Sequence, residues 1–183
     1  QFLEVVDEAT ARARVDAATA HLAPRRAEVA LADALGRVLA DDVRAPVDAP
    51  AFDRSNLDGF AVRAADTFGA EEMEPRTFRL NPEPLTPGVM PTSEVGPGTA
   101  TAIATGAVVP RGADAVVMVE YTDVVGDSIE LCRPATPGAN ITFAGTDIGR
   151  GETVLRRGEL LTSRETGVLA ALGVARVAVV RRP

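Results

Sequence analysis

The sequence lacks lysine and tryptophan, and its 183 residues include only one cysteine and one histidine. Without lysine the chain can neither form a Schiff base nor carry the lysine of a phosphate-binding P-loop. The single cysteine, Cys132, excludes an internal disulfide, and together with the single histidine, His21, it excludes a zinc site made of cysteine and histidine ligands. A metal bound by this chain would therefore need oxygen ligands.

Aromatic residues and positive charge are also scarce. Six phenylalanines and Tyr121 are the only aromatic residues, so the core must rest on valine, leucine, isoleucine and alanine. The 19 basic residues, all arginine, face 26 acidic ones, and the formal net charge of −7 is unlike that of a general nucleic-acid binder. No apolar run approaches the roughly 18 residues of a membrane span, and the acidic start QFLEVVDEAT is unlike a signal peptide. We expect a cytoplasmic globular protein that binds neither nucleic acid nor a membrane.

Helical patterns are confined to three segments. Apolar residues at helical spacing predict a long helix over residues 2–22 and a short one over residues 33–40. A third helix is predicted to begin after Thr162, because Glu165 follows three residues later as in a capping box, and to end at Gly173.

Strand patterns are more numerous. The residues between 113 and 133 form two β-rich runs joined at Gly126 and Asp127, which predicts a hairpin. Residues 81–98 are so rich in proline and glycine that edge strands and turns are expected there and a helix is not. Further strands are predicted at 28–31, 59–66 and 175–182. About eight short strands with two or three helices, and no βαβ alternation, predict a mainly β, α+β fold.

Three loops concentrate glycine, aspartate and arginine: residues 53–60, 104–114 and 143–152. Glycine allows the backbone to turn so that several N–H groups converge on an anion, and carboxylates in such loops suit Mg²⁺. One interpretation is a site for a phosphorylated or adenylylated ligand with a bridging Mg²⁺. The other is a set of ordinary turns, since Asx-Gly pairs are common turn residues.

Four segments, taken in order, resemble one known family. The run PVDAPAFDRSNLDGFAVRAADT is similar to the P-x-F-D-x-S-x-x-D-G-Y/F-A-V-R-A-x-D motif of the molybdopterin molybdenumtransferases, the MoeA family that includes the gephyrin E domain. The runs ATGAVVPRGADAVVMVE, PGANITFAGTDIGRGE and LLTSRETGVLAALGVARVAV match its later T-G-A loop, its P-G-x-N-x-x-x-x-G-x-D segment and its closing helix and strand. The matches span nearly the whole chain.

The resemblance implies a fold that periodicity alone does not supply. It implies a β-rich N-terminal region of two lobes with bifurcated or coiled sheets, working as a homodimer. We expect one dimer-forming lobe with helices from residues 1–50 and 140–183, and a second, β-rich lobe from residues 51–139. The family's molybdopterin-binding α/β domain and small C-terminal β-domain are expected to be absent from these residues.

The resemblance also implies an activity. Members insert molybdate into adenylylated molybdopterin with release of AMP, in a Mg²⁺-assisted step. We therefore expect transferase activity in the full-length parent and an inactive fragment. The residues that match the family's functional positions are Asp58, Thr105 and Asp147, which are expected to serve in catalysis, with Asp58 and Asp147 as Mg²⁺ ligands. Arg54, Ser55, Gly59 and Gly106 are expected to bind adenylylated molybdopterin.

The chain departs from the family's commonest pattern at several positions. Where many members read D-N-S-A-M-D-G-Y, this chain has Arg54, Asn56, Leu57 and Phe60, and where they read N-x-R and G-E-D it has Thr142 and Thr146. Arg54 adds a positive charge beside the expected anion site, and Thr146 removes a carboxylate. These departures keep two alternatives open: a non-catalytic dimerisation or binding module, fused for example to a ligand-sensing domain, and a tungstate-handling paralogue.

Overall fold

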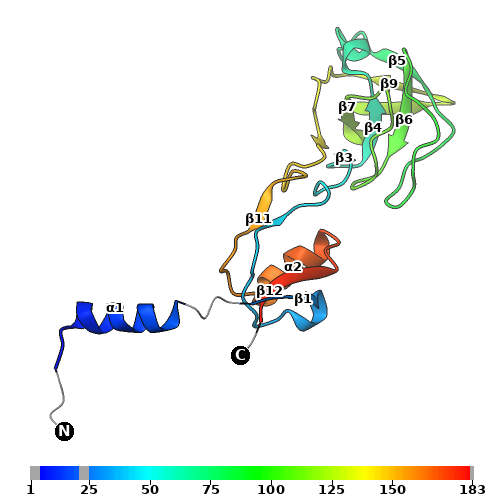
Figure 1. Ribbon diagram of the computed structural model, residues 1–183. Helices are drawn as coiled ribbons and strands as arrows, with labels where there is room; N and C mark the ends of the chain where they lie inside the picture. The colour runs from blue at the N-terminus through cyan, green and yellow to red at the C-terminus, as the bar shows by residue number, and fades with distance from the viewer. Residues whose placement is uncertain (1–4, 21–24, 182–183) are drawn as a thin grey trace. The chain divides into compact units, whose positions relative to one another are not determined.

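Two compact units make up the chain: residues 1–44 with 153–183, and residues 45–152. The computed structural model, drawn in Figure 1, describes residues 5–20 and 25–181. The units differ from the expected lobes in two segments, because residues 45–50 and 140–152 belong to the second unit. Backbone pairing explains this, since Ala49 pairs with Ile148.

The first unit has a small core between two strand pairs and a helix. Strand β1 (Arg26–Ala30) pairs antiparallel with β12 (Arg176–Val180), and β2 (Val43–Arg44) pairs antiparallel with β11 (Thr153–Leu155). Helix α2 spans Ser163–Ala171. The buried side chains of this core are Ala34, Leu39, Leu155, Leu161, Leu169, Val177 and Val179. The strands predicted near residues 28–31 and 175–182 are thus confirmed as β1 and β12.

The predicted capping box begins α2. The Thr162 hydroxyl contacts the Glu165 carboxylate, which also accepts the Thr162 N–H at 3.0 Å, while the Arg164 N–H donates to Thr162 Oγ1 at 3.3 Å. Gly173, with a φ of +74°, follows the helix in the left-handed conformation typical of a helix end. The sequence therefore predicted both ends of α2 correctly.

The helix predicted over residues 33–40 is wrong. A single 3-10 turn, η1 (Leu31–Asp33), stands at its start, and Gly36 then adopts a φ of +71°, which no right-handed helix contains. Beyond it Leu39 is fully buried and forms an antiparallel bridge with Val179. Burial of Leu39 against the strands outweighed the weak helical pattern of a segment that contains glycine.

The N-terminal helix α1 spans Glu8–Thr19, inside the predicted range 2–22. The Asp7 side chain caps it by accepting the Thr10 N–H at 2.7 Å. None of its residues is buried. Residues 2–4 and 21–22 of the predicted helix, including His21, lie outside the described residues.

A six-stranded sheet dominates the second unit, in the order β7-β4-β6-β5-β9-β8. All neighbours pair antiparallel except β5 and β6, which are parallel. Figure 1 shows that this sheet is curled rather than flat. Its strands are β4 (Gly59–Val62), β5 (Arg76–Leu80), β6 (Thr99–Ile103), β7 (Ala115–Met118), β8 (Thr122–Val125) and β9 (Ser128–Leu131). This confirms the expected mainly β class with few helices.

Strand β4 is buried on both faces of this sheet. Phe60 and Val62 point into one apolar cluster with Phe78 and Ile129, whereas Ala61 belongs to a second cluster on the other face. This alternation is the period of two that a pleated strand imposes. The strand is shorter than the predicted range 59–66, because it ends at Val62 and the 3-10 turn η2 (Ala64–Thr67) follows.

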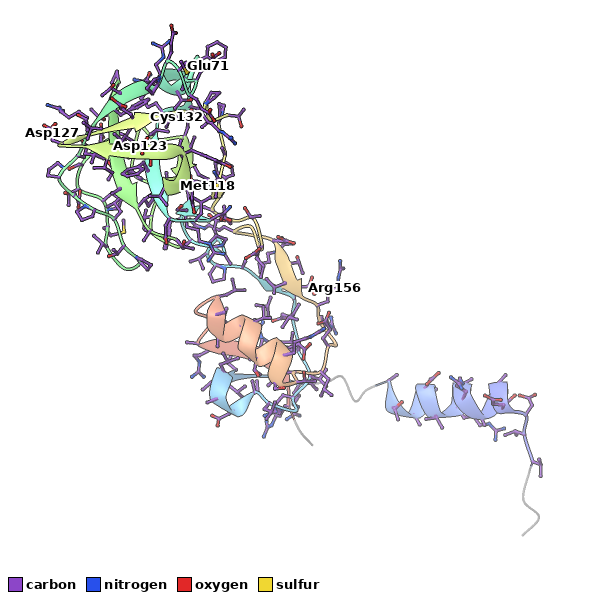
Figure 2. All side chains as sticks on the ribbon, turned by 180° about the vertical axis from the view of Figure 1, so that it is seen from behind. Glu71, Met118, Asp123, Asp127, Cys132 and Arg156 are labelled. Carbon is purple, nitrogen blue, oxygen red and sulfur yellow. The ribbon has the colours of Figure 1, made fainter. Side chains whose placement is uncertain are left out.

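Two further predictions concern the edges of the sheet. The predicted hairpin is confirmed, because β8 and β9 pair across Gly126 and Asp127, and Figure 2 shows Asp127 at its tip. Residues 81–98 contain no helix, as predicted, and only a single bridge between Leu85 and Ile103. The chain from 5 to 20 and from 25 to 181 contains no helix long and apolar enough to cross a membrane.

Candidate functional site

One end of the curled sheet brings Asp58 and Thr105 together. Asp58 directly precedes β4, and Thr105 lies two residues after the end of β6. These strands pair antiparallel with Gly59 opposite Ile103, so the residue before β4 lies close to the residues after β6. The two positions are 47 residues apart in the chain.

The side chain of Asp58 is held by two hydrogen bonds from Thr105. The Thr105 N–H donates to Asp58 Oδ1 at 2.7 Å, and the Thr105 hydroxyl donates to the same oxygen at 2.9 Å. The backbone bond and, after it, the hydroxyl bond keep the pKa of Asp58 below its usual range, because both favour the ionised carboxylate. Asp58 is therefore an exposed carboxylate, ionised at neutral pH, with a fixed orientation.

A shallow pocket of about 360 Å³ opens beside this pair. Asp58 is the one ionisable side chain that lines it among the described residues. The rest of the lining is mostly apolar and consists of Gly59, Phe60, Pro84, Leu85, Thr86, Ala102, Ile103, Ala104 and Val119. The arrangement offers one oriented negative charge at the rim of an apolar surface.

The backbone beside Thr105 is tied to β3 (Arg54–Ser55). The Gly106 N–H donates to the Ser55 carbonyl at 2.8 Å, and the Ser55 N–H donates to the Ala107 carbonyl at 3.0 Å. The N–H groups of both Thr105 and Gly106 thus already donate to acceptors within the protein. Anion binding by these N–H groups would require such bonds to be exchanged for bonds to the ligand.

Gly59 lies opposite Met118, where the backbone of β7 leaves no room for a side chain. A Cβ added at this position would lie 1.9 Å from the Val117 carbonyl oxygen. Position 59 therefore requires glycine, because the two backbones pack too closely for a side chain. Contact between Gly59 and a ligand stays a prediction.

Three of the residues that depart from the quoted motifs lie on or beside β3 and its partner strand β10 (Ile141–Thr142). Arg54 is exposed and lies opposite Thr142 in the antiparallel pair. The Thr142 hydroxyl donates to Asn56 Oδ1 at 2.5 Å, although 86 residues separate them. In the sequence these three positions are separate departures, and nothing in their spacing indicates that they are neighbours.

Asp147 is not part of the Asp58–Thr105 pair. Its N–H donates to the Ala49 carbonyl at 3.0 Å. Strands β3 and β10 run antiparallel, with Ile141 opposite Ser55. The chain therefore leaves β3 toward Asp58 at one end of this pair and leaves β10 toward Asp147 at the other end. Asp147 is exposed.

Two aspartates that sequence analysis did not single out hold the loop of Asp147. Asp53 Oδ1 accepts the Ala144 N–H at 2.8 Å, and Asp48 Oδ1 accepts the Arg150 N–H at 2.7 Å. The available signal was weak, because aspartates near proline and glycine are usual in turns, and here they anchor a loop about 100 residues away.

Comparison with known proteins places these features in a family. The family model described as MoeA N-terminal region (domain I and II) matches residues 5–173 of this chain. The chain is 44% identical over 154 residues to molybdopterin molybdenumtransferase 2 of Mycobacterium tuberculosis, covering 84% of this chain and 38% of that protein. It is 43% identical over 159 residues to the molybdopterin molybdenumtransferase of Bacillus subtilis, covering 85% and 37%.

A solved structure agrees with the sequence matches. The crystal structure of a molybdopterin biosynthesis MoeA protein from Pyrococcus horikoshii superposes with a TM-score of 0.84 at 39% identity, covering 87% of this chain and 41% of that one. The chain therefore spans about two fifths of the length of the relatives it matches.

Proposed function

The chain belongs to the MoeA family, of which it represents the N-terminal region, and from this premise we propose that it serves in a molybdopterin molybdenumtransferase. The proposed reaction of the whole protein inserts molybdate into adenylylated molybdopterin and releases AMP. The substrates are adenylylated molybdopterin and molybdate. The 183 residues alone are expected to be inactive, because catalysis needs the reacting groups to be positioned together, and the family resemblance assigns the pterin to a further domain.

The observation that carries this proposal is the pair of Asp58 and Thr105. The aspartate of the S-x-x-D-G motif and the threonine of the T-G-A loop are distant in sequence, yet they share two hydrogen bonds at one exposed sheet end. Asp58 and Thr105 are both exposed, so a ligand can reach the pair. We therefore assign them a role in binding or catalysis.

The ionisation of Asp58 limits the chemistry that it supports. Because the bonds from Thr105 lower its pKa, Asp58 is an acceptor and not a general acid at neutral pH. As an acceptor it can orient a water molecule, a ligand hydroxyl or a hydrated cation. Arg54, an exposed guanidinium on β3, is the proposed contact for a phosphate group of the ligand.

Asp58 can supply only part of the ligand set that Mg²⁺ needs. Both hydrogen bonds from Thr105 go to Oδ1, which leaves Oδ2 for a cation, and Mg²⁺ in proteins often has one or two carboxylates with water and substrate phosphates. Within residues 5–20 and 25–181 no group of three or more acidic, histidine or cysteine side chains could hold a metal. We propose that Asp58 offers one carboxylate oxygen to Mg²⁺, with water and the phosphates of the ligand as its other partners. The second ligand that the resemblance implies, Asp147, extends from the other end of the β3–β10 pair, so its part in the same ion's coordination rests on the resemblance alone. The ion would neutralise charge on the phosphates of the ligand.

The remaining assignments rest on the resemblance alone. We propose a homodimer and a cytoplasmic location for the whole protein. Gly106 is proposed as a ligand contact of the T-G-A loop, beside Thr105.

The test of the proposed function is AMP release from adenylylated molybdopterin by the full-length parent. We expect release that depends on Mg²⁺ and is stimulated by molybdate, and we expect Asp58→Ala to abolish most of it. Thr67→Val is a suitable control, because this buried hydroxyl in η2 bonds to the Ala64 carbonyl and the Ala135 N–H and not to Asp58 or Thr105. Full activity of Asp58→Ala would contradict the proposal. Stimulation by tungstate in place of molybdate would identify a tungstate-handling paralogue.

A second candidate function, a non-catalytic binding module, is favoured by one observation. The N–H groups of Thr105 and Gly106 are engaged within the protein, so the loop is not open to an anion as it stands. A folded parent dimer that binds its ligand and releases no AMP would support this candidate over the transferase.

A further inference from the structure

Ser55 is one of only a few polar residues that are buried in the described part of the chain, with 2% of its surface exposed. Its hydroxyl donates to the Leu57 carbonyl at 2.6 Å and also accepts the Leu57 N–H at 3.3 Å. A single hydroxyl therefore closes the turn that immediately precedes Asp58. Water does not compete strongly for these bonds, because Ser55 is buried and Leu57 is partly buried.

The backbone of Ser55 faces the loop that carries Thr105. It exchanges hydrogen bonds with Gly106 and Ala107, the two residues that follow Thr105. Thr105 in turn donates twice to Asp58. The contacts thus form a closed circuit from Ser55 through the turn to Asp58, across to Thr105, and back through Gly106 to Ser55.

We propose that Ser55 is a positioning residue, whose hydroxyl fixes the turn so that the Asp58 carboxylate meets both donors of Thr105. This inference rests on the proposed function only for the importance of Asp58. Ser55 itself contacts no ligand in this role, because its side chain is buried and its hydroxyl bonds to Leu57. Without that hydroxyl the turn has other conformations available, and the two bonds from Thr105 form for only part of the time.

The test is solution NMR of the 183-residue chain, read at the Thr105 amide. A hydrogen bond to a carboxylate moves an amide proton downfield and slows its exchange with solvent. In Ser55→Ala we expect an upfield shift of this proton and exchange faster by roughly tenfold, the factor that corresponds to one typical hydrogen bond. Asp58→Ala, which removes the acceptor, sets the full size of the effect.

The matched control is Thr67→Val, which also removes a buried hydroxyl from the second unit. Thr67 Oγ1 donates to the Ala64 carbonyl at 2.7 Å and takes no part in the circuit. We expect this variant to leave the Thr105 amide unchanged. A wild-type Thr105 amide in Ser55→Ala, or an equal change in Thr67→Val, would overturn the positioning role.

A second variant covers the case in which Ser55→Ala does not fold. Ser55→Cys keeps a small side chain with a weak donor and is expected to give a smaller change in the same direction. No change at Thr105 in folded Ser55→Cys would then count against the inference. A parent that released no AMP would refute the proposed function and leave the NMR result standing, so the two failures are distinguishable.

Discussion

Replacing Gly59 with alanine tests the geometry that positions Asp58. The new Cβ would lie 1.9 Å from the Val117 carbonyl oxygen and 2.9 Å from its carbon, both backbone atoms that no rotamer change can move. Ordinary contact begins near 3.4 Å, so β4 and β7 must separate by about 1.5 Å, the difference between the two distances. Gly59 pairs with Met118 in this ladder, so the separation falls at the end of β4 that follows Asp58.

The expected cost follows from this separation. Hydrogen bonds near 2.9 Å that are stretched by such an amount exceed the normal range, and each one lost contributes about 1 kcal/mol. Overpacking in a closed space adds about 1–3 kcal/mol. For two lost bonds we therefore expect Gly59→Ala to lower the free energy of unfolding of the second unit by about 3–5 kcal/mol.

The assay is urea denaturation followed by tyrosine fluorescence. The chain has one tyrosine, Tyr121 in the second unit, and no tryptophan, so the signal reports on that unit. Gly149→Ala is the control, because its Cβ would be 3.9 Å from the nearest atom, Glu152 Oε2, and a change within about 0.5 kcal/mol is expected. An unchanged midpoint for Gly59→Ala would refute the packing argument.

Three further predictions concern other contacts. Hydrogen bonds from the Thr162 and Arg164 side chains lower the pKa of Glu165 from 4.5 to about 2 in the folded chain. As the pH falls, the Glu165 carboxylate is therefore protonated in the unfolded chain before it is protonated in the folded chain. The stability that Glu165 contributes should be complete above pH 4.5 and be lost as the pH falls toward 2, and thermal unfolding of Glu165→Gln should lack this part of the pH dependence. Gly106 has a φ of +80°, so Gly106→Ala should lower the urea midpoint by an amount that corresponds to about 1–2 kcal/mol. The Glu83 carboxylate accepts bonds from the Thr92 hydroxyl and N–H and from the Ser93 N–H, so Glu83→Ala should speed amide exchange at residues 92 and 93 without changing exchange in β4.

The parts of the fold that sequence predicted correctly depend on local chemistry. The hairpin of β8 and β9 follows from two β-rich runs on either side of Gly126 and Asp127, and α2 follows from its capping box. Both signals lie within a few residues of the structure they specify. The helix predicted over 33–40 failed because the burial of Leu39 against Val179, about 140 residues away, decided its conformation.

The candidate site was less accessible to sequence reasoning. Spacing alone left loops 53–60 and 104–114 open to interpretation as ordinary turns, and only the family resemblance selected Asp58 and Thr105. Their contact depends on the register of β4 and β6, which side-chain patterns do not specify across 47 residues. The contact of Asn56 with Thr142 was invisible for the same reason.

The most direct test of the account is a double-mutant cycle on AMP release by the full-length parent, with Asp58→Asn, Thr105→Val and the double variant. If Thr105 acts by holding the Asp58 carboxylate, the double variant should be about as active as Asp58→Asn alone, because residues that act as a unit are not additive. Losses that multiply would mean that the two residues act independently, and this would contradict the account.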